Sequence, residues 1–115
     1  MTGESIRFLD TEAALDEATS LPLALLYKHS TRCGTSRRAM VEVERFACAQ
    51  PEVPVFGIDV IRHRDISDRA AARLEVTHQS PQAVLLRSGI PVWTASHWRI
   101  TAAVLAETVR QLAPD

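Results

Sequence analysis

The hydrophobic and polar positions of this chain change their period several times, and each change predicts a new element. Residues 23–27 form a continuous apolar run and a second run covers 55–60, both typical of strands buried on two faces. Between them, 33–49 places apolar side chains on one stripe and charged ones opposite, which predicts an amphipathic helix. Shorter helices are predicted at 11–19 and 65–74. Up to this point the chain therefore alternates helices and strands.

The C-terminal third adds a hairpin and a last helix. Apolar segments at 83–86 and 90–95 flank the turn-forming pair Ser88 and Gly89, which predicts two antiparallel strands, and Thr101 can cap a final helix. Helices between strands imply parallel crossovers. We therefore expect an α/β fold with a four-stranded mixed sheet and helices on both faces, which is the thioredoxin-like architecture. A further short strand at 6–9 is compatible with the pattern. Several small α/β folds share this order, so the candidate site has to discriminate between them.

Length and charge bound the classes of partner. With 115 residues, we expect one domain spanning 1–115. Lys and Arg number 13 against 14 Asp and Glu, so the chain has no electrostatic basis for binding nucleic acid or an anionic membrane. The N-terminus is polar, unlike a signal peptide, and the longest apolar run, 21–27, is too short to span a bilayer. We expect a cytoplasmic protein with reduced thiols.

Cys33 is the strongest candidate for chemistry, because it follows a buried strand by a short loop and begins the best-patterned helix. Unpaired N–H groups and the helix dipole favour a thiolate there. Lys28, Arg32, Arg37 and Arg38 crowd the same segment, and such a basic environment lowers the pKa of a cysteine. We predict a reactive thiolate at Cys33. The alternative is a structural cysteine packed as a small hydrophobic side chain.

The second thiol is predicted to be out of reach. Cys48 lies fifteen positions further along the same helix, on the order of 22 Å away, whereas a disulfide needs Cα atoms within about 7 Å. We expect Cys48 to fill core space. Ser36 occupies the position of the resolving thiol in a Cys-x-x-Cys motif, so the motif is monothiol and its release requires an external thiol. No metal is expected, because Cys33 and His29 lack a second ligand pair.

Four further positions carry predictions, and for two of them an alternative stays open. Ser80-Pro81 precedes a strand, where thioredoxin-like folds carry a cis-proline facing the nucleophile, and we expect a cis bond here. We expect Trp93 in the core. Trp98, with the histidine before it, is either a ligand-stacking side chain or part of a structural corner. Asp59 is either a proton acceptor for the thiol or a solvated strand end.

Four segments together resemble the monothiol bacilliredoxins, which are redox-active proteins of the bacillithiol system. They are 26–36 (which contains Cys33-Gly34-Thr35-Ser36), 59–67, 78–82 and 95–98. The resemblance implies a thioredoxin-like fold and removal of bacillithiol from protein mixed disulfides, with Cys33 as nucleophile. Bacillithiol would be a thiol co-substrate rather than a bound cofactor, and the partners would be bacillithiolated client proteins and a low-molecular-weight thiol. The family motif usually has Pro-Ile where this chain has Gly34-Thr35, which loosens the first helical turn.

The residues expected to bind the thiol substrate around the Cys33 nucleophile are Lys28, Arg32, Gly34, Thr35, Ser36, Ser80, Pro81 and Trp98. Two other functions stay open. Cys-Gly-x-Ser is also similar to the monothiol glutaredoxins, some of which share an iron–sulfur cluster through glutathione, although their Gly-Gly pair after the hairpin is missing because Gly89 stands alone. The other alternative is a non-enzymatic thioredoxin-like module that binds a protein partner.

Overall fold

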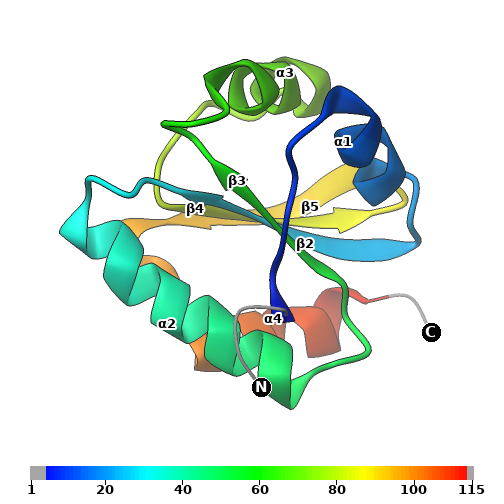
Figure 1. The fold of residues 1–115 in the computed structure, drawn as a ribbon. Coiled ribbons are helices and arrows are strands. Elements are labelled where there is room, and N and C mark those ends of the chain that lie inside the picture. The colour runs from blue at the N-terminus through cyan, green and yellow to red at the C-terminus, as the bar shows by residue number, and fades with distance from the viewer. Residues whose placement is uncertain (1–4, 114–115) are drawn as a thin grey trace.

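The computed structural model describes residues 5–113 and places a single mixed sheet between two layers of helices (Figure 1). The strand order is β1-β3-β2-β4-β5, in which β1, β3 and β2 run parallel and β4 and β5 are antiparallel to their neighbours. Figure 1 shows α1 and α3 on one face of the sheet and α2 and α4 on the other. The elements are β1 (Arg7–Phe8), α1 (Glu12–Thr19), β2 (Leu23–His29), α2 (Gly34–Ala49), β3 (Val55–Asp59), α3 (Arg64–Leu74), β4 (Gln82–Arg87), β5 (Ile90–Ser96), the 3-10 helix η2 (His97–Arg99) and α4 (Ala102–Leu112).

The expectation of four strands is corrected to five. The additional strand, β1, forms inside the segment 6–9 and pairs with β3 at Arg7↔Phe56 and Phe8↔Gly57. Both β1 residues are exposed, so this strand carries little of the burial pattern that marks the others.

Alternation along β2 divides the core into two parts, because successive strand side chains point to opposite faces. Leu25 and Tyr27 pack in the cluster beneath α2 and α4, whereas Ala24 and Leu26 pack in the cluster beneath α1 and α3. β2 is buried from Ala24 onward, as its apolar run predicts. It extends two residues beyond the predicted strand, to His29.

Local signals set several element boundaries. Thr11 and Thr101 cap α1 and α4, since each hydroxyl accepts a hydrogen bond from the third residue along. The β4–β5 hairpin turns through Ser88 and Gly89 with φ of 51° and 80°, as a two-residue turn of the mirror-image type requires. A Cβ on Gly89 would lie 2.5 Å from the Thr19 carbonyl oxygen, so a side chain has no room there.

Candidate active site

The strand register brings the candidate residues to one edge of the sheet. Lys28, near the end of β2, pairs with Gln82, the first residue of β4, and β3 ends beside β2 at Asp59. Cys33 lies in the short connection from β2 to α2. We call the edge at which β2, β3 and β5 end and β4 begins the thiol edge.

The Ser80-Pro81 peptide bond reaches the same edge and is cis, as the sequence predicts. Pro81 directly precedes β4, and its carbonyl oxygen accepts a hydrogen bond of 3.1 Å from the His97 backbone N–H. Gln82 pairs with Ser96, so η2 begins beside the proline. The thiol edge therefore unites the Cys33 loop, the cis-proline and η2.

Cys33 is the N-cap residue of α2 and is partly exposed. Hydrogen bonding by the Ser36 backbone N–H, opposed in part by burial and assisted by the Thr35 N–H and by both hydroxyls, lowers the pKa of Cys33 below its ordinary value. The predicted direction is thus confirmed, and the first turn of α2 supplies the cause.

Lys28 does not have the predicted role in lowering that pKa. Lys28 is 2% exposed and faces α3, on the side of the sheet opposite α2, where Nζ donates to the Ser67 carbonyl oxygen at 3.1 Å. Its Nζ also lies 3.2 Å from His78 Nδ1. The expectation that Lys28 contacts the thiol substrate is therefore corrected: strand alternation turns its side chain away from Cys33. Arg32 and Arg37, which flank Cys33 along the chain, are both exposed.

Arg38 fixes η2 onto α2. Its guanidinium lies over the Trp98 ring at 4.6 Å and donates through Nη2 to the carbonyl oxygens of Trp98 and Ile100, each at 3.2 Å. Trp98 itself is 66% exposed. These contacts support the structural-corner interpretation. Because the Trp98 ring is exposed at the thiol edge, ligand stacking stays a prediction.

Comparison with known proteins decides the family. The model of the monothiol bacilliredoxin BrxC family matches residues 7–105. The chain belongs to this bacilliredoxin family. A structure described as a thioredoxin-fold protein with inferred oxidoreductase activity is 26% identical, with a TM-score of 0.83, covering 90% of this chain and 93% of that one.

Two thioredoxins share the fold at lower identity. A variant from Halobacterium salinarum is 18% identical, with a TM-score of 0.78, over 100% of this chain and 96% of its own. Mitochondrial thioredoxin 3 from Saccharomyces cerevisiae is 20% identical, with a TM-score of 0.75, over 95% of this chain and 97% of its own. The thioredoxin-like fold is thus confirmed, and family and fold together support a thiol oxidoreductase.

This chain has Gly34 and Thr35 at the two positions where the bacilliredoxin motif usually has Pro-Ile. Gly34 is the first helical residue of α2, and a Cβ there would meet only Arg37 Nη2, at 3.7 Å. Packing therefore does not require a glycine. Thr35 donates hydrogen bonds to the Cys33 thiolate from its N–H and its hydroxyl. An isoleucine at this position could donate only from its N–H.

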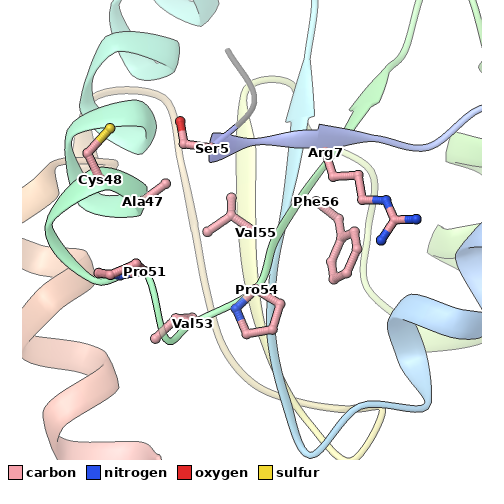
Figure 2. Close-up of a pocket in the computed structure, with 9 residues that line it drawn as sticks. All are labelled: Ser5, Arg7, Ala47, Cys48, Pro51, Val53, Pro54, Val55 and Phe56. Atoms are coloured by element: carbon pink, nitrogen blue, oxygen red, sulfur yellow. The ribbon is translucent and has the colours of Figure 1, made fainter. Parts of the chain in front are cut away.

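The prediction that Cys48 fills core space is wrong. Cys48 is an exposed free thiol, because the neighbouring Ala47 takes the inward position at this turn of α2. It borders a hollow of about 440 Å³, whose apolar wall includes Pro51 and Val55, near the end of α2 remote from Cys33 (Figure 2). The helix length still separates the two thiols.

The structure also shows where the Asp59 and Trp93 side chains lie. Asp59 Oδ1 accepts hydrogen bonds of 3.0 Å from the backbone N–H groups of Ile61 and Arg62, so the carboxylate closes the turn after β3. Trp93 is half-buried and packs against the cluster beneath α2 and α4, rather than inside it.

Tyr27 and His29 are polar residues of the site that the sequence pattern did not predict. Tyr27 is fully buried, and its hydroxyl donates to the Ser36 carbonyl oxygen at 2.8 Å and lies 2.9 Å from His29 Nδ1. The available signal was a pair of polar side chains on one face of a buried strand, directly before the Cys-x-x-Ser motif.

Within residues 5–113, no three or more His, Cys, Asp and Glu side chains gather in an arrangement that could hold a metal ion. Across the same residues, every helix is too short or too polar to cross a membrane.

Because Lys28 is buried, we expect the stability of the fold to depend on pH. Burial, opposed in part by Asp68, lowers the pKa of Lys28 to about 8, against about 10.4 in an unfolded chain. Between these values the unfolded state binds more protons, so the free energy of unfolding rises with pH there. Between about pH 7.5 and 9.5, the free energy of unfolding of the wild type should therefore rise by roughly 1–2 kcal/mol relative to that of Lys28→Met. Urea unfolding of both proteins across this range measures the gain, and a constant difference would contradict the assignment.

Proposed function

We propose that this protein is a monothiol disulfide reductase that removes bacillithiol from protein mixed disulfides, with Cys33 as the nucleophile. The observation that carries the proposal is the pairing of a partly exposed Cys33, whose pKa is lowered by the first turn of α2, with a serine three residues later. A thiolate attacks disulfides, and a serine hydroxyl cannot form one.

The reaction proceeds as two thiol exchanges. The Cys33 thiolate attacks the bacillithiol sulfur of the mixed disulfide, the original S–S bond breaks, and the client leaves as a thiolate that takes a proton from water. Bacillithiol is then held on Cys33 as a new mixed disulfide. An external low-molecular-weight thiolate attacks that bacillithiol sulfur, which frees Cys33 and leaves a disulfide between the two small thiols. Electrons therefore come from the external thiol.

The residues around Cys33 have distinct proposed parts in binding. The Ser80 backbone and the Pro81 ring would line the bound thiol compound, Arg32 would supply an exposed positive charge, and the exposed Trp98 ring would offer a stacking surface. Thr35, Ser36 and the Gly34 backbone would surround the reacting sulfur. Lys28 has no proposed contact with the substrate.

Transfer of bacillithiol to the protein tests this function. A bacillithiolated client is incubated with the protein near neutral pH, and intact and peptide masses are recorded. We expect a bacillithiol adduct on Cys33 and a freed client thiol. Because the pKa of Cys33 is lowered, the transfer rate should rise with pH and level off below the pH at which an ordinary cysteine would.

Three variants serve as controls. Cys33→Ala should form no adduct, whereas Ser36→Ala should keep it, since the serine hydroxyl assists the thiolate without reacting. Cys48→Ser should behave as the wild type, because Cys48 lies near the other end of α2. Absence of transfer by the folded wild type, or an adduct on Cys48 alone, would refute the proposal and favour a binding module.

A further inference from the structure

A short chain of buried polar groups lies beneath the first turn of α2. Tyr27, which is 0% exposed, sends its hydroxyl from β2 to the Ser36 carbonyl oxygen at 2.8 Å. His29, two residues along the same face of β2, brings Nδ1 to 2.9 Å from that hydroxyl. A buried phenol among apolar side chains is stabilised only when its hydroxyl has partners, and both partners here belong to the segment around Cys33.

The direction of each hydrogen bond follows from the donor inventory. A carbonyl oxygen only accepts, so the Tyr27 hydroxyl hydrogen points to Ser36. The phenol oxygen then accepts from His29, which therefore carries its proton on Nδ1 and leaves Nε2 as an acceptor. Burial lowers the pKa of His29, against the opposing charges of Asp59 and Glu44 and a hydrogen bond with the Ser36 backbone, and this direction favours the neutral ring. Burial, with the charges of Cys33 and Glu44, raises the pKa of Tyr27, so the phenol remains a donor.

Ser36 is thereby held from two sides. Its carbonyl receives the Tyr27 hydroxyl, and its own hydroxyl oxygen accepts the Ser30 backbone N–H at 3.2 Å. Ser36 is 0% exposed, and its N–H and hydroxyl are among the groups that stabilise the Cys33 thiolate. A small rotation of this turn would misalign those donors, and hydrogen bonds weaken steeply with misalignment.

We propose that Tyr27 and His29 are positioning residues for the Cys33 thiol: the histidine orients the phenol, and the phenol holds the first turn of α2 with its donors facing the sulfur. The inference rests on the proposed function in taking Cys33 as the reacting thiol. It adds that the reactivity of this thiol is set from β2, beneath the helix, as well as by the helix itself.

The pH profile of Cys33 alkylation tests this role without any bacillithiol. Iodoacetamide modification is followed by peptide mass spectrometry, which separates Cys33 from the exposed Cys48 and makes Cys48 an internal reference. Tyr27→Phe removes one oxygen and keeps the ring. In this variant the pH midpoint of Cys33 alkylation should rise by about one pH unit, so that alkylation at a pH well below the midpoint becomes about tenfold slower. The Cys48 profile should stay unchanged.

Matched variants separate positioning from general loosening of the fold. Thr19→Val removes a hydroxyl that also donates to helix carbonyls, at Leu15 and Asp16, and should leave the Cys33 midpoint unchanged. His29→Asn keeps an N–H donor near the position of Nδ1, whereas His29→Leu removes it. We expect the midpoint to rise in His29→Leu and to be largely restored in His29→Asn.

The outcomes are decisive in both directions. A folded Tyr27→Phe with the wild-type Cys33 midpoint would overturn the inference, and if that variant fails to fold, equal midpoints in His29→Leu and His29→Asn would do so. Failure of the proposed function looks different, because a wild type with a low Cys33 midpoint that accepts no bacillithiol would refute the function and leave this positioning role standing.

Discussion

Replacing Ser36 by cysteine is expected to shorten the lifetime of the bacillithiol adduct on Cys33 at least about 100-fold, because an intramolecular thiol reacts at a high effective concentration. Ser36 is in the first turn of α2, three positions from Cys33, and its side chain interacts with the Cys33 sulfur. Cys33 is the N-cap of this turn and Ser36 is its third residue, and a disulfide between the two positions needs Cβ atoms about 3.5–4.5 Å apart. The introduced thiol should attack Cys33, expel bacillithiol and close a disulfide.

Intact mass measured over time, with no external thiol added, follows this conversion. The wild type should keep its adduct until a small thiol is supplied, whereas Ser36→Cys should lose it spontaneously. Ser36→Ala is the matched control, since it removes the hydroxyl without adding a thiol and should retain the adduct. Equal adduct lifetimes in Ser36→Cys and the wild type would mean that the first turn of α2 does not hold position 36 against Cys33.

The largest effect on stability is expected from Phe46→Ala. Phe46 is 1% exposed and lies on the inward stripe of α2, in the cluster that joins this helix to the sheet and to α4. Truncating a buried phenylalanine costs about 3–5 kcal/mol, from lost burial and from the cavity left behind. A domain of this size has a total stability of about 5–15 kcal/mol, so the variant should retain only part of it. Its Tm should fall by roughly 10–20 °C.

Thermal and urea unfolding followed by circular dichroism measure this loss. Val41→Ala provides a matched control on the same helix, because Val41 is 46% exposed, and exposed substitutions usually change stability by less than about 0.5 kcal/mol. A similar loss in both variants would show that the inward face of α2 contributes nothing beyond helix propensity, contrary to the observed packing.

The thiol edge could be assembled in outline from the chain alone. The apolar run that becomes β2, the amphipathic pattern that becomes α2 and the turn residues at Ser88 and Gly89 are all local signals. They placed Cys33 at a helix start and Ser80-Pro81 before a strand, and both placements are confirmed. Once β2 is known to be antiparallel to β4, these two local placements converge on one edge of the sheet.

The misplaced side chains share one physical cause. Lys28 is only five residues from Cys33, but strand alternation turns its side chain beneath α3. Cys48 has apolar neighbours in the sequence, but a helix turns about 100° per residue, and Ala47 occupies the inward direction. In both cases closeness along the chain does not give a shared orientation, because orientation depends on the element and on what packs against it.

By itself, the sequence determined the order of the elements, the place of Cys33 at the start of a helix and the absence of a second thiol within its reach. Each of these follows from local periodicity, from helix-terminus chemistry or from chain length. Only the tertiary structure decided that β1 forms, since two exposed residues become a strand only when β3 lies beside them. It also decided that Tyr27 and His29 support the Cys33 turn, because that contact requires β2 and α2 to be packed together.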